Sequence, residues 1–566
     1  MEIRKTFLLL FCVAFVISSC TKDDFALNKS TEEKTGLNFS ITETDYENVK
    51  TNATRSDRTL TQSELVSLGD NIEATVEERV PSSYSHTRAE TRAITTPKHY
   101  SIRAYQNGIL KGRMKGTFNG NTFTPDAGTA SKMSLEPGEY DFLCYNDKFH
   151  EVGEDIELSL VDAKDAYFCQ KKVTIYNQAK QDVPFEMKHA CARMNVRLEC
   201  YGKAGTNVVA NISPVTSNAP TKITYDRNSN SFVPTNGVVT GGTQTYSTMH
   251  DPDKRTGEPA WVDADEYLYF LPGTDCTKLQ MSFVSGTMFG RSLLGTSAIR
   301  FLTVGELFQA NKSYHLQVTL WPKWDYLFSD GTTGSLASNP TKNPIGLVVL
   351  QKTATSRGLA AALKSIPDLT RFATWNGGGT FSFTHGFNTT SYATLPSAML
   401  DMAGEHWAYD ASGTPDGIVK VNDQASFPGP YAAAHFDPGY TITGANVGRW
   451  FIPSLGQVIS LFNTMARVAG FQEDYWSSWT DWNTLSSEYD FVAMSAALTR
   501  YFPLRGPNRK PIGSGLIFSS STSFGLITST AINDVAIATL GGANRKLFVK
   551  KGIIDEYGEI RPFIHF

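Results

Sequence analysis

Polar and apolar residues alternate along short stretches of the first 320 or so residues, which is the pattern of strands half-buried in a sheet. The clearest case is residues 36–42, where Leu37, Phe39 and Ile41 share one face and polar residues occupy the other. The same period of two recurs at residues 72–76, 172–176, 194–200 and 314–320. Turn-rich segments separate these stretches, so the spacing predicts β-sandwiches.

The pattern changes after about residue 325, where the chain becomes rich in Trp, Gly and Ser and two helices are predicted. One is expected near residues 396–403 and should end at Gly404. The other begins at Ser454, where Gln457 completes a capping box, and Gly470 stands where a C-terminal cap belongs. The apolar residues between these caps recur at helical spacing, which indicates a face packed on a core.

Length, composition and charge narrow the class of protein. At roughly 150 residues per domain, 566 residues predict three to four domains. The chain is 41% hydrophobic and 12% aromatic, which supports packed cores. Its 52 basic and 56 acidic side chains nearly cancel to a net charge of −4, so no nucleic-acid partner is expected. A β-rich extracellular protein fits these values.

Residues 1–20 predict the compartment. Two basic residues precede an apolar run over 7–17, which is too short to span a bilayer as a helix. Residues 17–20 (ISSC) resemble a bacterial lipobox, in which residues 1–19 are a signal peptide and Cys20 becomes acylated. The alternative is an ordinary secretory signal with an incidental cysteine. Residues 21–24 (TKDD) resemble the surface-export signal of Bacteroidetes lipoproteins, so we expect a lipoprotein of the outer membrane.

The strand at 36–42 is followed by a polar stretch with basic residues and no apolar anchor, residues 51–58 (TNATRSDR). Such a segment should be exposed and open to proteases. A cut after Arg55, or after Arg58 as the second choice, would make the strand removable and uncover an apolar groove with unpaired backbone groups. The alternative is that both are solvated loop arginines. Three further arginines, Arg79, Arg88 and Arg92, lie beyond another predicted strand.

Seven cysteines give no metal site and no fixed disulfide pattern. Cys12 falls in the signal peptide and Cys20 would carry lipid. The other five are Cys144, Cys169, Cys191, Cys200 and Cys276, and the sequence leaves their pairing open. No cysteine and histidine spacing is typical of zinc, so no metal and no cofactor is expected. No P-loop, H-E-x-x-H or G-x-S-x-G occurs either, so we do not expect an enzyme; a secreted hydrolase is the alternative.

Three passages resemble fimbrillin-type pilins of the type V class: residues 135–142 (LEPGEYDF), 183–190 (VPFEMKHA) and 311–318 (NKSYHLQV). The resemblance covers about residues 30–320. It implies two transthyretin-like β-sandwich domains, at 56–205 and 206–324, preceded by a lipidated tether and removable strand at 20–55. It also implies that an Arg-specific surface protease removes the strand and that the next pilin subunit inserts its own.

Three later passages resemble a C-type-lectin-like domain over 325–566: residues 448–454 (GRWFIPS), 475–478 (YWSS) and 561–563 (RPF). The ligand sets of calcium-dependent lectins and the late cysteine pair of the related oxidases are missing, so the resemblance brings no metal and no redox chemistry with it. Residues 410–447 are the best candidate for a variable binding loop. The candidate ligand contacts are Trp479, Trp482 and Tyr489, which could stack on sugar rings; the alternative is that they are buried core aromatics.

Together these features predict a mainly β protein, with two transthyretin-like β-sandwich domains followed by an α+β C-type-lectin-like domain. Its expected function is that of a fimbrial tip subunit and adhesin, because a chain that continues into a folded module after its second sandwich can receive a strand but not give one. The expected partners are other pilin subunits, the Arg-specific protease, the outer membrane before cleavage, and a glycan or protein ligand on a host or bacterial surface. The alternative is a cell-anchored, glycan-binding surface lipoprotein that does not polymerise.

Overall fold

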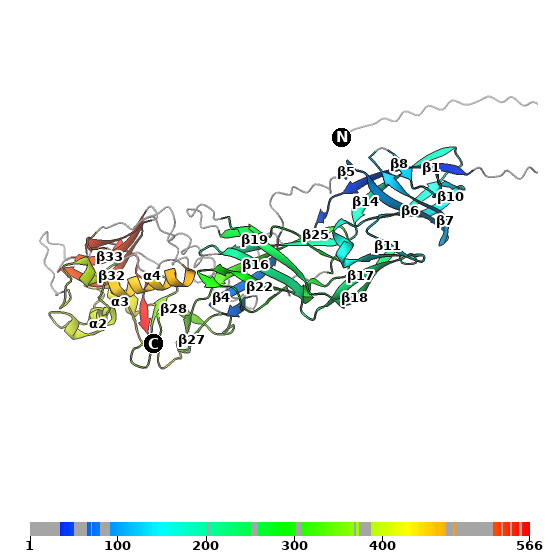
Figure 1. The fold of residues 1–566 in the computed structure, drawn as a ribbon. Coiled ribbons are helices and arrows are strands. Elements are labelled where there is room, and N and C mark those ends of the chain that lie inside the picture. Colours follow the sequence, from blue (N-terminus) through cyan, green and yellow to red (C-terminus); the bar gives the residue numbers. More distant parts are fainter. Residues whose placement is uncertain are drawn as a thin grey trace, which may run out of the picture.

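The structure is a computed structural model, and it describes residues 34–49, 65–69, 71–79, 91–120, 122–200, 203–250, 259–301, 307–366, 370–372, 387–470, 479–482, 524–533, 536–543, 546–553 and 557–566. Strands dominate these residues, which confirms the predicted mainly β class. The sheets follow one another along an elongated molecule, with the helices at the end opposite the first strand (Figure 1).

The first unit consists of a nine-stranded sheet and a four-stranded sheet. The nine strands are β1 (Thr35–Thr44), β5 (Thr91–Ala93), β6 (Lys98–Gln106), β7 (Ile109–Phe118), β8 (Phe123–Pro125), β9 (Ser134–Leu135), β10 (Gly138–Asn146), β13 (Tyr167–Ile175) and β14 (Lys180–His189). The four strands are β11 (His150–Val152), β12 (Asp155–Ser159), β17 (Asn218–Asp226) and β18 (Ser231–Val238), and the 3-10 helix η2 (Leu160–Asp165) follows β12.

The nine-stranded sheet curves until it encloses a core of its own. Phe39 of β1 lies 6.1 Å, between ring centroids, from Phe123 of β8, although the two strands stand near opposite ends of the sheet. One hydrophobic cluster is therefore built from this sheet and from residues directly next to its strands. A second cluster lies against the four-stranded sheet and joins side chains such as Tyr145 of β10 and Leu158 of β12.

The second unit packs a seven-stranded sheet on a five-stranded one around a single large core. The seven strands are β2 (Glu47–Asn48), β3 (Val66–Gly69), β4 (Ile72–Glu78), β15 (Ala192–Cys200), β20 (Ala260–Asp263), β21 (Leu268–Phe270) and β25 (Lys312–Pro322). The five strands are β16 (Thr206–Pro214), β19 (Gly242–Thr248), β22 (Leu279–Met288), β23 (Arg291–Ser292) and β24 (Ile299–Arg300), and η3 (Cys276–Lys278) precedes β22.

The strands at 36–42, 72–76, 172–176, 194–200 and 314–320 are present as β1, β4, β13, β15 and β25, as their alternation predicts. Strands on either side of the predicted domain boundary at residues 205/206 pair with each other. Strand β15 before the boundary pairs with β25 after it, and β12 before the boundary pairs with β17 after it. The two predicted pilin domains and their limits stay a prediction. The pairing establishes that each of the first two units contains strands from both sides of this position in the sequence.

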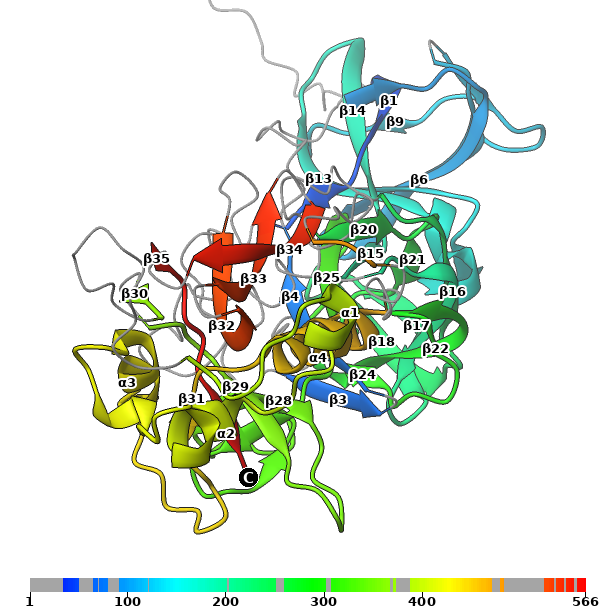
Figure 2. The ribbon, with the colours of Figure 1, turned by 90° about the vertical axis from the view of Figure 1, so that its left-hand side faces the viewer.

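The C-terminal unit combines a six-stranded sheet, a three-stranded sheet, a two-stranded pair and the helices (Figure 2). The six strands are β26 (Tyr326–Phe328), β27 (Thr333–Gly334), β28 (Pro344–Leu350), β29 (Leu359–Ala362), β31 (Trp450–Phe451) and β36 (Phe563–His565). The others are β32 (Phe524–Asn533), β33 (Ala536–Ala543) and β34 (Lys546–Ile553), and the pair β30 (Thr370–Arg371) and β35 (Tyr557–Gly558). The helices are α1 (Leu395–Ala398), α2 (Gly404–Tyr409), η4 (Ala411–Gly413), η5 (Lys420–Asn422), α3 (Pro428–Ala434) and α4 (Leu455–Ala469).

Helix α4 forms as its caps predict. The side-chain carbonyl of Gln457 accepts from the Ser454 amide at 2.9 Å, and Gly470 closes the helix in the left-handed conformation with φ 82°. A Cβ at Gly470 would lie 2.4 Å from the carbonyl carbon of Phe289, so glycine also permits the close approach of the second unit. Arg291 of β23 donates to the carbonyls of Val468 at 2.9 Å and Arg467 at 3.2 Å.

The prediction for residues 396–403 was wrong in length and in the role of Gly404. Helix α1 spans only Leu395–Ala398, and Gly404 begins α2 instead of ending a helix. The carboxylate of Asp401 explains the break, because it accepts from the Ala403 amide and from the Trp407 indole. A Cβ at Gly404 would lie 2.4 Å from Oε1 of Gln457, so this glycine serves close packing against α4.

Among the described residues, Cys144, Cys169, Cys191 and Cys276 are free thiols. Cys144 of β10 and Cys169 of β13 stand directly opposite each other in register. Cys144, Cys191, Cys200 and Cys276 are buried.

Candidate functional site

Strand β1 lies between β14 on one side and β5 and β9 on the other, and the place that it fills between them is the groove of this unit. The strand is paired very unequally on its two sides. Its parallel partner β14 runs alongside for eight register pairs, from Gly36 opposite Lys180 to Glu43 opposite Met187. On its other side β9 pairs with only two residues of β1 and β5 with only three. Removal of β1 would therefore open one long ladder on β14, while only short pairings on the other side are lost.

Three alternate side chains of β1 fill the groove. Leu37, Phe39 and Ile41 are 7%, 8% and 2% exposed, and all belong to the core enclosed by the nine-stranded sheet. The Phe39 ring lies 5.8 Å from that of Phe185 on β14. Asn38 and Ser40, between them, point to solvent. Burial of each apolar side chain contributes about 1.5–3 kcal/mol, so β1 is held chiefly through this face.

The predicted cleavage arginines Arg55 and Arg58 lie outside the described residues, as do Arg88 and the lipidation residue Cys20. The segment that holds Arg55 and Arg58 joins β2 to β3, so a cut there separates β1 and β2 from the remainder of the chain. These sites stay predictions.

Arg79 and Arg92 are poor protease sites in the folded chain. Arg79 pairs with Asp263 at 2.9 Å, with its side chain 11% exposed, and its amide donates to the carbonyl of His315. Arg92 lies within β5, opposite Glu43, and pairs with Asp45 at 2.6 Å. A cut at Arg79 would also free β3 and β4, which the second unit needs for its sheet.

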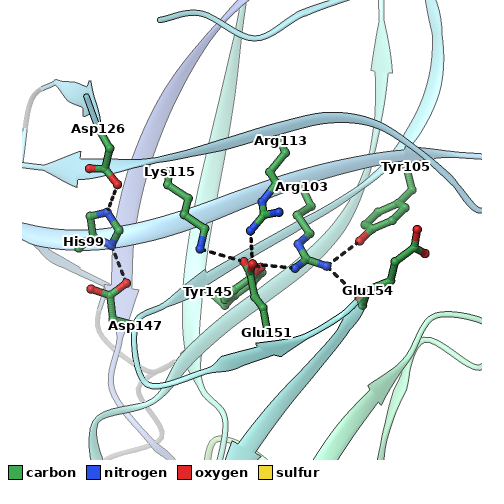
Figure 3. A network of polar contacts seen from close by, with 10 residues as sticks. All are labelled: His99, Arg103, Tyr105, Arg113, Lys115, Asp126, Tyr145, Asp147, Glu151 and Glu154. Atoms are coloured by element: carbon green, nitrogen blue, oxygen red, sulfur yellow. Dashed lines mark hydrogen bonds and ion pairs between the residues drawn. The ribbon is translucent and has the colours of Figure 1, made fainter. Parts of the chain in front are cut away.

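A polar network fixes the four-stranded sheet to the nine-stranded sheet (Figure 3). Glu151 of β11 lies among Arg103, Arg113 and Lys115 and accepts a hydrogen bond from Tyr145 at 2.5 Å. Burial would raise the pKa of the Glu151 carboxyl, but the Tyr145 hydrogen bond and the three cations outweigh it and lower the pKa to about 2. The carboxylate therefore stays charged at neutral pH and ties β11 to β6 and β7.

His99 forms a second part of this region, with one ring nitrogen 2.5 Å from Asp147 and the other 2.8 Å from Asp126 (Figure 3). Burial would lower its pKa, but the hydrogen bonds and charges of the two carboxylates raise it overall. Sequence reasoning missed the network because its members are spread over residues 99–154 and form no motif.

The candidate ligand aromatics of the C-terminal unit are placed unequally. Trp479 is 4% exposed and belongs to the largest core of this unit, whereas Trp482 packs on that core while partly exposed. The Lys551 ammonium lies 5.3 Å from the centre of the Trp482 ring. Tyr489 lies outside the described residues. Of the two described tryptophans, Trp482 is therefore the one that is partly exposed.

A buried lysine inside the predicted binding stretch 410–447 had no sequence signal. Lys420 of η5 is 0% exposed and donates to Oδ1 of Asn388 and to the Trp407 carbonyl, both at 2.9 Å. Burial lowers the pKa of this lysine to about 7, against a small opposing effect of Asp416. Its two acceptors come from separate parts of the chain, so Lys420 holds this stretch to the body of the unit.

No protein-family model matches the chain, and no curated protein matches it. Among solved structures, a fimbrial protein from Bacteroides ovatus is similar with 12% identity and a TM-score of 0.27, over 94% of this chain and 100% of that one. The fimbrial anchor protein Mfa2 from Porphyromonas gingivalis is similar with 10% identity and a TM-score of 0.24, over 56% of this chain and 96% of that one. Both similarities are low and carry no argument about this chain.

Within the described ranges, no helix has the length and hydropathy needed to cross a membrane. Over the same ranges, no group of three or more His, Cys, Asp and Glu side chains is arranged so that it could hold a metal ion.

Proposed function

We propose that the chain is a fimbrial tip subunit and adhesin, whose leading segment is removed by an Arg-specific surface protease and replaced by a strand of the next pilin. The leading segment is here residues 35–48, that is β1 and β2 with the residues between them. The proposal rests on how β1 is bound in the first unit. The strand buries three side chains and forms eight register pairs with β14, whereas only short strands pair with its other side.

The framework around this groove supports the exchange of a strand. The Glu151 network ties β11 to β6 and β7 without using any residue of β1. The unit therefore keeps polar contacts that hold its two sheets together when β1 departs. An incoming strand would pair with the open edge of β14 through main-chain bonds and fill the apolar positions in turn.

A terminal place in the fibre is supported by the path of the chain after β25. The chain passes from β25 at Pro322 to β26 at Tyr326, and Trp321 and Trp324 both belong to the core of the C-terminal unit. The stretch after the second unit is thus committed to a folded module and is not free for donation. In this proposal the subunit accepts a strand, and the C-terminal unit binds a glycan or protein ligand without catalysis.

The test is digestion of the full chain with an Arg-specific protease, followed by N-terminal analysis of the product. We expect a start at Ser56, a start at Thr59 for Arg55→Lys, and no cleavage in this segment for the Arg55→Lys, Arg58→Lys double variant. The lysine variants are matched controls because they keep the charge. Purified fibres in which residues 35–48 are still joined to the body would contradict the proposal.

The same analysis separates the alternative function. A cell-anchored, glycan-binding lipoprotein that does not polymerise keeps an acylated Cys20 in its mature form, whereas the proposed tip subunit carries its lipid only as a precursor. Mass spectrometry of the surface form therefore decides between the two.

A further inference from the structure

The leading segment is held by more than its apolar face, because three of its polar or aromatic residues make specific contacts with the body, which is the chain that remains after the cut. Those residues are Glu43, Tyr46 and Glu47, and their partners come from β6, β14, β15, β25 and the short link between β14 and β15. The partners stay behind when residues 35–48 leave. They therefore set requirements for whatever takes the vacated place.

Glu43 follows Leu37, Phe39 and Ile41 on the inward face of β1, two residues after Ile41. Its carboxylate lies 2.5 Å from the Lys98 ammonium and accepts from the Tyr100 hydroxyl at 2.7 Å. Tyr100 is 0% exposed, so its hydroxyl is left in the core when this acceptor is lost. A replacement strand with a carboxylate at the position of Glu43 restores the contacts with Lys98 and Tyr100.

Tyr46 fills a pocket at the junction of the first and second units. Its ring stacks on His189 at 3.7 Å between centroids, and the Arg193 guanidinium lies 4.4 Å from its ring centre. The hydroxyl is 3.1 Å from Sγ of Cys191, and the residue is 7% exposed. An aliphatic side chain at this position could neither stack on the imidazole nor make the cation–π contact with the guanidinium.

Glu47 adds a second charged contact directly after the ring. Its carboxylate lies 2.7 Å from the ammonium of Lys312 and 3.6 Å from that of Lys188. The Lys312 hydrogen bond is the main cause that lowers the pKa of Glu47. Its amide donates to the Asn311 carbonyl at 2.8 Å, which fixes the backbone beside β25.

We propose that the body selects its incoming strand by this polar pattern: a carboxylate two residues after the last of three alternating apolar side chains, a tyrosine three residues after that carboxylate, and a second carboxylate directly after the tyrosine. The occupant is a segment of another protein chain that runs parallel to β14 and carries this pattern after three alternating apolar residues. The inference rests on the proposed strand exchange. It adds which partner strand is accepted, by matching negative charge and an aromatic ring to Lys98, Arg193 and Lys312.

The experiment uses the full chain with a single engineered protease site within residues 51–64. After cleavage, a labelled synthetic peptide with the sequence of residues 35–48 is offered, and its displacement of the cut segment is followed by fluorescence anisotropy. Peptides with Glu43→Gln, Tyr46→Leu or Glu47→Gln are compared with it. A peptide with Ser40→Ala, changed on the outward face, is the matched control.

We expect each of the three altered peptides to bind at least about tenfold more weakly, and the Ser40→Ala peptide to stay within about twofold of the unaltered one. When the body carries Lys98→Met, the difference in affinity between the unaltered peptide and the Glu43→Gln peptide should become smaller, because the positive charge that pairs with Glu43 is absent. The Glu47→Gln loss should also shrink in high salt.

Two different failures are distinguishable. If the unaltered, altered and control peptides all bind equally well, the groove selects only for alternating apolar side chains. The proposed selection by polar pattern is then overturned, whereas strand exchange remains supported. If no peptide displaces the verified cut segment, β1 is not exchangeable, and the proposed function falls together with the inference.

Discussion

The ring of Tyr46 stacks on the imidazole of His189 at 3.7 Å between centroids, with 12° between the ring planes. The contact joins residues 143 positions apart, since 189 − 46 = 143, and it lies where β14 of the first unit leads into β15 of the second. A side chain of the leading segment thus packs where the first and second units meet. Several properties of the protein should depend on this segment and on the contacts between the units.

Acidic pH should lower the stability of the fold around the leading segment, through His189. Burial, together with repulsion from Arg193 and Lys98, lowers the pKa of His189 to about 3. The unfolded histidine takes up its proton near its ordinary pKa of 6.5, whereas the folded one does not, so stability is lost as the pH falls below about 6.5. At pH 5.5 the loss from this one group is about 1 kcal/mol.

Urea unfolding at pH 7.5 and 5.5 measures this loss. In His189→Gln the difference between the two pH values should be smaller by that amount than in the unaltered chain. His435→Gln, a change at an exposed histidine of the C-terminal unit, is the control. An equal pH dependence in all three proteins would refute the assignment to His189.

Phe39→Ala should destabilise the first unit by about 3–5 kcal/mol, because it removes a buried ring between Phe123 and Phe185 and leaves a cavity. Asn38→Ala, on the solvent face of the same strand, should cost less than about 1 kcal/mol, although Asn38 donates to Asp182 at 3.1 Å. Urea midpoints at one pH give both values. Similar losses for the two variants would show that β1 is not held through its apolar face.

Arg291→Ala should weaken the link between the second unit and the C-terminal unit. The guanidinium supplies donors to the carbonyls of Val468 and Arg467 in the last turn of α4, although the Arg467 carbonyl also accepts from the Gly470 amide. Removal of the guanidinium should cost about 1–3 kcal/mol. Arg300→Ala, at an exposed residue of the neighbouring β24, is the matched control. Calorimetry of the full chain should show an earlier C-terminal transition for Arg291→Ala only; unchanged transitions would contradict the role of Arg291.

Alkaline pH should stabilise the C-terminal unit. The pKa of Lys420 is about 7 in the folded chain against an ordinary value of 10.5, so the unfolded state holds the extra proton between these values and stability rises with pH across this window. Between pH 7 and 9 the gain from this group is about 2 kcal/mol.

Lys420→Met should abolish that gain, although it also leaves the Asn388 and Trp407 oxygens without their donor and so lowers stability at pH 9. Lys364→Met, at a lysine that is not fully buried, keeps the pH dependence of the unaltered chain. Thermal midpoints at pH 7 and 9 for the three proteins decide the matter, and a persistent gain in Lys420→Met would rule out this lysine as its source.

The local elements that depend on periodicity and on helix caps can be predicted from the amino-acid sequence. Alternation at Leu37, Phe39 and Ile41 is sufficient to predict a strand with one apolar face, and Ser454 with Gly470 is sufficient to place both ends of α4. These signals are local, because each residue's role depends on neighbours within a few positions.

How those elements combine becomes visible in the folded chain alone. Glu73 and Thr75 read as the polar face of a strand, yet both are buried in β4, where Trp321 donates to Thr75 at 3.2 Å. Gly404 reads as a helix end but serves close packing on α4, and the pocket of Tyr46 needs residues from two units that the chain brings together only on folding. Long-range burial and contact depend on the path of the whole chain, and no short pattern encodes that path.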